Sequence, residues 1–342
     1  MTTAPPLLEV EDLTMYFRLK RPGLVSRLKG RTPDVLKAVD GVSFAIRRGD
    51  AIGLVGESGC GKSTLGRCIV GLYEPTGGQV RFDGAAVGSG HSKDAASIRR
   101  AQIIFQDPYS SLNPRMTVRQ TLMEAMRVHH IVPGDALEAR CSELLDLVRL
   151  SRRVAHAYPR QLSGGQRQRV SIARALAVEP ELLIADEPVS SLDVSVQATV
   201  LNLLAELRKE LGLTLLLIAH NMAVVRHVCD RTMVMYLGRV IESGPTDELF
   251  ADPRHPYTQA LLAAVPRLIP GRASTAPALT GDPPSPIRLP PGCRFNPRCP
   301  MAEDVCLRTE PNLVPGATQA DRAVACHFGW TAAEEAPRAE VP

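Results

Sequence analysis

Strand-like stretches alternate with longer amphipathic stretches along the first 260 residues of the chain. Five stretches have the length and residue types of β-strands, and each is followed by a polar residue or glycine: 8–17, 42–46, 51–55, 182–185 and 213–219. Three others place apolar residues at helical spacing: 65–72, 166–178 and 195–211. Strands that alternate with helices predict an α/β fold on a mostly parallel sheet covered on both faces.

Proline and cysteine usage changes near residue 265. Fourteen of the 28 prolines lie from Pro266 onward, and four of the eight cysteines lie within residues 293–326. Proline-rich segments favour loops over regular elements. We therefore expect an α/β domain over 8–265, a small Cys/Pro-rich extension over 266–330 and a flexible tail over 331–342.

Composition excludes several classes of protein. The 342 residues are 44% hydrophobic, enough for a sizeable core, and 40 basic against 36 acidic side chains give a net charge of only +4. That balance does not favour a nucleic-acid partner. The longest apolar runs are far below the ~18–20 residues of a membrane-spanning helix, and the N-terminus lacks a secretory signal pattern. We expect a cytoplasmic protein.

A phosphate-binding loop follows the strand predicted at 51–55. The residues fit the pattern G-x-x-x-x-G-K-[ST], and the next residue is Thr64: Gly56, Glu57, Ser58, Gly59, Cys60, Gly61, Lys62 and Ser63. Glycines let backbone N–H groups close around phosphate oxygens, and the following helix adds its positive N-terminus. We expect Lys62 to contact the β- and γ-phosphates, Ser63 to bind Mg²⁺ and Thr64 to hold the α-phosphate side.

A pair of acidic residues ends the apolar run at 182–185. An acid at the carboxyl edge of a parallel sheet, beside a phosphate loop, suits a metal-bound triphosphate. We expect Asp186 to orient Mg²⁺ through its water shell and Glu187 to act as general base toward the attacking water. The alternative is an ordinary solvated turn, which the phosphate loop makes a poor explanation.

Residues 162–169, Leu-Ser-Gly-Gly-Gln-Arg-Gln-Arg, resemble the signature motif of ABC-type ATPases. Ser163 is placed as a helix N-cap, and Gly164 and Gly165 expose backbone N–H groups at the helix start. The resemblance implies a P-loop NTPase of the ABC type with an inserted helical subdomain at about 107–160. It also implies that Ser163, Gly165 and Gln166 meet the γ-phosphate held by an opposite subunit, so that ATP joins a dimer.

Other landmarks of that family fall in the same order along the chain. Gln106 matches the residue that senses Mg²⁺ and the attacking water, and His220 matches the switch histidine at the γ-phosphate. Asp193 ends the segment that crosses the dimer, and either Tyr16 or Phe17 stacks on adenine, with Phe17 favoured by register. Each alone has an ordinary structural explanation. Two departures, Asn221 and Ser191, remove no catalytic group, so we expect hydrolysis to survive.

Two stretches resemble the ATPases of dipeptide and oligopeptide importers, in particular the second of their two paralogous ATPases: 105–116 and 249–258. This resemblance covers about residues 8–330. It implies ATP-powered peptide import through two transmembrane permease subunits, with a paralogous ATPase as heterodimer partner and an extracytoplasmic substrate-binding protein. The chain would lie at the cytoplasmic face of the membrane. The alternatives are a nickel or metal-chelate importer of the same family and a soluble ABC ATPase outside transport.

The four clustered cysteines are Cys293, Cys299, Cys306 and Cys326. In a reducing compartment such a cluster indicates metal ligation before disulfides. Structural zinc usually comes with C-x(2–4)-C knuckles, which these spacings lack, whereas wide loop-borne spacing favours a [4Fe–4S] cluster. The resemblance points to the same cluster. Zinc and unligated or disulfide-linked thiols stay open, and ATP and Mg²⁺ complete the expected cofactors.

Overall fold

The main sheet of this computed structural model has eight strands in the described residues, which are 5–19, 34–87, 99–264, 281–317 and 319–330. The strand order is β11-β12-β10-β9-β3-β8-β7-β6. Neighbours from β9 to β6 run parallel, and β10, β12 and β11 continue the sheet antiparallel. The strands are β3 (Ala51–Val55), β6 (Ala101–Ile104), β7 (Leu182–Asp186), β8 (Thr214–Ala219), β9 (Arg231–Tyr236), β10 (Arg239–Pro245), β11 (Val314–Pro315) and β12 (Ala323–Val324).

Both faces of the parallel strands are buried, as the sequence predicts. Successive residues of β8 pack into opposite clusters: Leu215 and Leu217 face one, and Leu216 and Ile218 face the other. One cluster includes helix α8 (Val194–Leu211), and the other includes α2 (Lys62–Ile69). A strand buried on both faces must be apolar at every position, which explains why these runs do not alternate.

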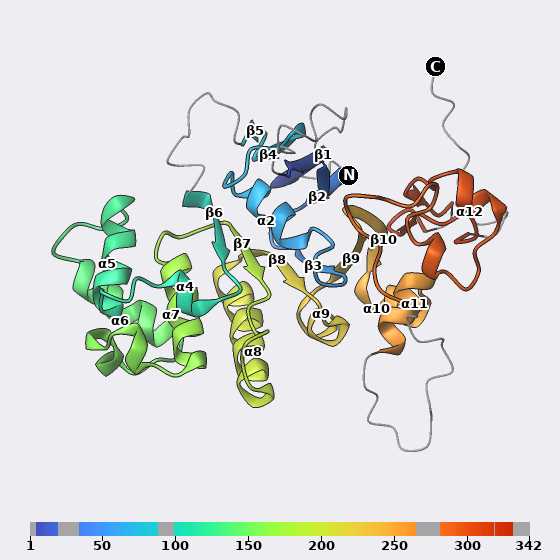
Figure 1. The fold of residues 1–342 in the computed structure, drawn as a ribbon. Helices are drawn as coiled ribbons and strands as arrows, with labels where there is room; N and C mark the ends of the chain where they lie inside the picture. The colour runs from blue at the N-terminus through green and yellow to red at the C-terminus, as the bar shows by residue number, and fades with distance from the viewer. Residues whose placement is uncertain (1–4, 20–33, 88–98, 265–280, 318, 331–342) are drawn as a thin grey trace, which may run out of the picture.

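A second sheet, not predicted as a separate unit, covers the α2 side. Its order is β2-β1-β4-β5, and its described pairs are antiparallel. The strands are β1 (Leu8–Arg18), β2 (Val35–Ile46), β4 (Gly77–Phe82) and β5 (Ala85–Ala86). Figure 1 shows this sheet above the parallel one. The sequence showed only parts of it because β1 and β2 are half-buried and carry several polar residues.

The helical subdomain expected from the resemblance is present at one end of the molecule (Figure 1). Helices of this subdomain pack against α7 (Gly164–Leu176), and a capping box between Thr117 and Gln120 starts α5 (Val118–Val128). They are α4 (Pro108–Ser111), α5 (Val118–Val128), α6 (Leu137–Leu147), η1 (Arg152–His156) and η2 (Pro159–Gln161).

The C-terminal extension lies at the opposite end (Figure 1) and joins the main fold. Strand β12 pairs with β10, and Phe295 is buried against Tyr236 and Tyr257 at ring-centroid distances of 5.4 and 5.5 Å. The expected flexible tail at 331–342 lies outside the described residues. The remaining helices are α9 (Met222–Val228), α10 (Thr246–Ala251), α11 (Pro256–Ala263), η3 (Asn296–Arg298) and α12 (Asp304–Arg308).

Candidate functional site

The carboxyl ends of four parallel strands bring the predicted phosphate and catalytic residues to one edge of the sheet. Gly56 follows β3, Glu187 follows β7, and His220 follows β8. Gln106 lies two residues after the end of β6. Open α/β sheets bind their ligands at this edge. The topology therefore assembles, from four separate parts of the chain, the residues that the sequence singled out.

The phosphate loop wraps around the Lys62 side chain, which is only 3% exposed. Lys62 Nζ donates hydrogen bonds to the carbonyl oxygens of Gly56 and Glu57, at 2.8 and 2.9 Å. Gly61 has φ of 111°, and a Cβ there would lie 2.0 Å from the Ala38 carbonyl oxygen. Helix α2 begins at Lys62 with its N-terminal amides at the loop. These features make an anion site of backbone N–H groups and one ammonium.

The other loop residues differ in exposure. Ser58 and Gly59 are exposed at the rim, and Thr64 is half-buried at the start of α2. Cys60 is buried, with its Sγ 3.8 Å from Lys62 Nζ, and burial raises the pKa of its thiol. A protonated buried thiol is a poor nucleophile. Cys60 therefore serves as a small packing residue in the loop.

Ser63 and Asp186 form the part of the site that fits Mg²⁺. Ser63 Oγ donates to Asp186 Oδ1 at 2.8 Å, and Asp186 Oδ2 is buried without a hydrogen-bond partner in the described residues. Burial raises the pKa of Asp186. A buried carboxylate oxygen without a partner is costly unless a cation or ordered water satisfies it. Oxygen donors of this kind suit Mg²⁺.

Glu187 lies at the centre of a small polar cluster. Its Oε2 accepts a hydrogen bond from Gln106 Nε2 at 2.9 Å and lies 3.4 Å from His220 Nδ1, while Lys62 Nζ is 4.0 Å from Oε1. Its backbone has φ of 44° and donates to the Ile218 carbonyl at 2.9 Å. The carboxylate is therefore directed at the phosphate loop and held by the two residues that the resemblance named.

The signature segment begins α7 as the sequence predicts. The Ser163 side chain accepts from Gln166 N, and the Gln166 side chain accepts from Ser163 N, in a reciprocal capping box. A Cβ at Gly165 would lie 2.5 Å from Val196, just after Asp193, so this glycine permits close packing of α7 on α8. Within the described residues, no hydrogen bond or ion pair joins Ser163, Gly165 or Gln166 to the phosphate loop.

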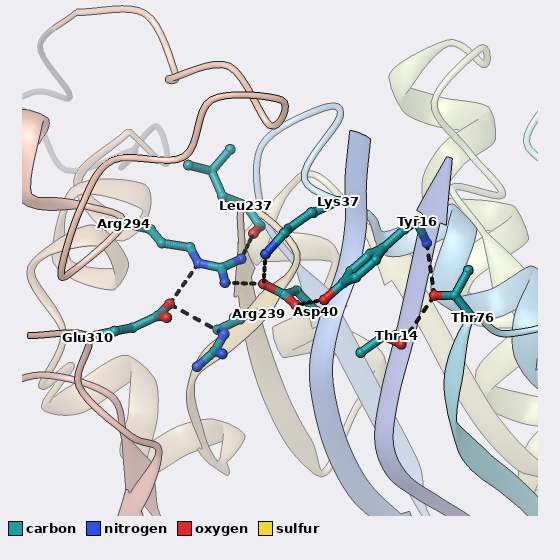
Figure 2. Close-up of polar contacts among 9 residues, drawn as sticks. All are labelled: Thr14, Tyr16, Lys37, Asp40, Thr76, Leu237, Arg239, Arg294 and Glu310. Carbon is teal, nitrogen blue, oxygen red and sulfur yellow. Dashed lines mark hydrogen bonds and ion pairs between the residues drawn. The ribbon is translucent and has the colours of Figure 1, made fainter. Parts of the chain in front are cut away.

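The two candidate adenine residues have different partners. The Tyr16 hydroxyl donates to Asp40, which also pairs with Arg294 of the C-terminal extension (Figure 2). Burial and the Asp40 hydrogen bond raise the pKa of Tyr16 to about 12. Phe17 instead packs edge-on against Tyr73 at 5.7 Å. The Tyr16 hydroxyl thus belongs to a polar network, whereas the Phe17 ring packs against Tyr73 and the edge of the apolar core.

All four clustered cysteines line one cavity of about 240 Å³ in the extension, together with His255, Phe295 and His327. They are free thiols, and burial raises the pKa of Cys293 to about 11 and also raises those of Cys299 and Cys326. No three His, Cys, Asp or Glu side chains among the described residues stand in position to hold a metal. Sulfur is a suitable donor for a soft metal or an iron–sulfur cluster. The four thiols line the same cavity, but among the described residues they are not close enough together to hold a metal.

Sequence reasoning missed the arginines that join the extension to the site. Arg294 directly follows Cys293 in the sequence, and Arg298 directly precedes Cys299. Both side chains are buried, at 7% and 4% exposure, and pair with Asp40 and Glu57. Their position next to cysteines was the only local feature that marked them, since ion pairs more than 240 residues apart leave no sequence pattern.

None of the helices in the described parts of the chain is long and apolar enough to cross a bilayer.

Comparison with known proteins agrees with this geometry. The sequence matches the ABC transporter family over residues 39–190 and the oligopeptide/dipeptide transporter C-terminal region over 241–306. It is 47% identical to the Oligopeptide transport ATP-binding protein AppF of Bacillus subtilis, covering 94% of this chain and 97% of AppF. It is equally identical to the "Probable peptide ABC transporter ATP-binding protein y4tS" of Sinorhizobium fredii, covering 96% of this chain and 91% of that protein.

Among solved structures, the dimeric ATP-binding cassette MJ0796 bound to ADP and Pi has a TM-score of 0.59 at 28% identity, covering 70% of this chain and 98% of the cassette. Because relatives at 47% identity span nearly the whole chain, it belongs to the family of ATP-binding proteins of ABC transporters, in the group with the oligopeptide/dipeptide transporter C-terminal region.

Proposed function

We propose that this chain hydrolyses ATP to power the import of dipeptides or oligopeptides through partner transmembrane subunits. The observation that carries ATP hydrolysis is the placement of Glu187 at the phosphate loop, held by Gln106 and His220. The match of residues 241–306 to the peptide-transporter region, and the names of the relatives, support the peptide as cargo.

The chain's own residues divide the work of phosphoryl transfer. The loop amides and Lys62 bind and orient the β- and γ-phosphates, so that positioning and charge compensation lower the barrier. Ser63 and Asp186 would hold Mg²⁺, which supplies further charge compensation when bound. Glu187 accepts the proton of the attacking water, while Gln106 orients that water and His220 contacts the γ-phosphate.

The site of one chain is incomplete without a second ATPase. We infer that Ser163, Gly165 and Gln166 contact the γ-phosphate bound by an opposite subunit, with Asp193 at the dimer crossing. The start of α7 supports this role because its amides form an anion-binding helix N-terminus and, among the described residues, no hydrogen bond joins Ser163 or Gln166 to the phosphate loop of the same chain. The family favours a paralogous ATPase as the partner, an extracytoplasmic binding protein, and a place at the cytoplasmic membrane face.

We assign Phe17 to the adenine because the Tyr16 hydroxyl is already hydrogen-bonded to Asp40.

Uptake of a labelled tripeptide by cells that lack this chain tests the proposed cargo. We expect wild-type protein to restore uptake and Glu187→Gln to fail, because transport needs hydrolysis. Glu124→Gln, at an exposed position of α5, is the matched control and should restore uptake. If peptide uptake is unchanged by deletion while nickel uptake is lost, the metal-chelate importer replaces this proposal.

For the extension, we propose that Cys293, Cys299, Cys306 and Cys326 hold a [4Fe–4S] cluster, with Zn²⁺ as the alternative. The support is the soft four-sulfur donor set around one cavity. Binding would need the thiols to lose protons and close in. Iron, sulfide and zinc analysis of anaerobically purified protein decides it: about four irons and four sulfides per chain, lost in Cys293→Ser but kept in Cys141→Ser. Zinc alone, or no metal, contradicts the cluster.

A further inference from the structure

Arg298 of the C-terminal extension reaches the phosphate loop across the molecule. Its guanidinium forms two hydrogen bonds to the Glu57 carboxylate, from Nη1 to Oε2 at 2.7 Å and from Nη2 to Oε1 at 3.0 Å. Its side chain is 4% exposed, against 25% for Glu57. Two parallel charge-assisted bonds fix orientation as well as distance. Glu57 is the second residue of the loop, so this contact acts on the nucleotide site itself.

The backbone of Glu57 is held from the same side. Its N–H donates to the Tyr257 hydroxyl at 2.8 Å, and Tyr257 is fully buried between Tyr236 and Phe295. Phe295 is the N-cap of η3, a single turn within the extension, and Arg298 is the last residue of that turn. A rigid aromatic cluster therefore sets where the arginine stands, and the arginine and Tyr257 together set the main chain and side chain of Glu57.

Without Arg298, the negative charge of the Glu57 carboxylate would weaken the binding of phosphate groups at this loop. It is a negative charge on the rim of a loop built to receive a triphosphate, and Asp186 and Glu187 already place two carboxylates nearby. Like charges in a partly buried site repel more strongly than they do in water. The two-point pair with Arg298 compensates this charge and turns both carboxylate oxygens toward the extension.

We propose that Arg298 is a positioning residue of the ATP site: it holds the Glu57 carboxylate away from the triphosphate, and ATP affinity therefore depends on the C-terminal extension. This inference rests on the proposed role of residues 56–64 as the ATP-binding loop. Arg298 acts through Glu57 and touches no reacting atom. The extension thereby becomes part of the nucleotide site, in addition to any metal that it holds.

A double-mutant cycle on the full-length chain tests the proposal, with the dissociation constant for Mg-ATP as the readout. We expect Arg298→Met to weaken ATP binding about tenfold, since coupling between sites is typically 5–150-fold. In the Glu57→Gln background the same substitution should change affinity less than twofold, because no carboxylate remains to repel the phosphates. An effect of equal size in both backgrounds means that Arg298 acts only through folding, and it overturns the proposal, as does wild-type affinity in Arg298→Met.

Two controls separate the possible failures. Arg322→Met removes an equally buried arginine of the extension that pairs with Glu242 instead, and it should leave ATP affinity within twofold. Arg298→Lys keeps the charge but loses the two-point geometry, and it serves as the test if Arg298→Met fails to fold. A loss of ATP affinity clearly larger than in Arg322→Met supports the proposal. A loss no larger than in Arg322→Met overturns it. If wild type binds no ATP, or Lys62→Ala binds it normally, the proposed function itself is wrong.

Discussion

Asp186 and Glu187 are adjacent in the chain, yet they lie in different environments that suit different tasks. Asp186 is almost fully buried, bonded to Ser63, and burial raises its pKa. Glu187 is half-buried at the positive-φ turn after β7 and touches Gln106 and His220. Asp186 is thus placed at the proposed Mg²⁺ site, and Glu187 lies among polar side chains beside the phosphate loop. Adjacent acids with separated environments are typical of divided catalytic roles.

Glu187→Gln should therefore separate hydrolysis from binding. The amide keeps the size of the side chain and one acceptor oxygen for Gln106 Nε2, but it cannot accept the proton of the attacking water. We expect phosphate release to fall by about 10²–10⁴-fold, while the dissociation constant for Mg-ATP changes little. Phosphate-release kinetics and equilibrium ATP binding on the same preparation measure both, with Glu124→Gln as control. Wild-type turnover would remove Glu187 from the mechanism.

Asp186→Asn should instead change the requirement for magnesium. The variant keeps an oxygen that Ser63 can contact but loses the negative charge that faces a cation. We expect the Mg²⁺ concentration for half-maximal hydrolysis to rise by about 10–100-fold, the cost typical of losing a carboxylate that orients a metal's ligands. A titration of phosphate release against Mg²⁺ measures it. An unchanged half-maximal Mg²⁺ concentration would mean that a group other than Asp186 binds the Mg²⁺ ion.

At the scale of elements, local patterns predicted the strands and helices around the candidate site well and those of the extension poorly. The run at 182–185 ends within one residue of β7, and the expected helix at 195–211 starts one residue after α8 does. These elements follow from neighbouring residues alone. By contrast, β11 and β12 have two residues each, and their place in the sheet depends on β10, far back in the chain. So short a strand leaves no period to detect.

One buried histidine, His255, caps α11, the helix that precedes the extension in the sequence. His255 Nδ1 accepts from Tyr257 N at 3.0 Å, and its own backbone N–H donates to Glu242 Oε2 at 2.9 Å. Because Nδ1 must be an acceptor, the ring must be unprotonated there. Burial accordingly lowers the pKa of His255 from its ordinary 6.5 to about 3.

The His255 cap should make folding sensitive to acid in a defined window. The unfolded chain binds a proton at this ring below about pH 6.5 and the folded chain only near pH 3, so stability is lost as pH falls between these values. The slope is about 1.4 kcal/mol per pH unit. His255→Asn keeps a capping side chain without the titration, and its stability should fall less steeply from pH 6 to 4.5 in denaturant unfolding. Identical slopes would contradict a neutral buried ring.

At the scale of the whole molecule, two buried arginines that lie between the first two clustered cysteines help to bind the extension to the cassette. Arg294 pairs with Asp40 and Glu310 and donates to the Leu237 carbonyl at 2.5 Å, as Figure 2 shows. Arg298 pairs with Glu57 in the phosphate loop. Breaking a buried ion pair by removing one partner typically costs about 3–5 kcal/mol. The extension and the nucleotide site should therefore respond to each other.

The single tryptophan of the chain makes this linkage measurable. Trp330 is buried in the extension, with its indole N–H donating to the Val314 carbonyl at 3.2 Å and Arg254 over its ring at 5.3 Å. Its fluorescence reports unfolding of the extension. If loss of the Arg298–Glu57 contact weakens ATP binding about tenfold, then by reciprocity ATP must stabilise the folded extension. In Glu187→Gln, where ATP persists, ATP at 100 times its dissociation constant should stabilise the Trp330 transition by about 1.3 kcal/mol, because the chain with an unfolded extension still binds ATP tenfold more weakly.

Adding Arg298→Met to that variant should reduce the stabilisation at equal ATP saturation, because the ion pair that carries the linkage is gone. Adding Arg322→Met should lower the Trp330 midpoint without ATP yet preserve the shift on adding it, since Arg322 pairs with Glu242 and Asp252 and not with a residue of the phosphate loop. If the extension unfolds with the same midpoint whether or not ATP is bound, its stability is not coupled to the nucleotide site, and the linkage is contradicted. The buried pairs at Asp40 and Glu57 would then serve only to anchor the extension.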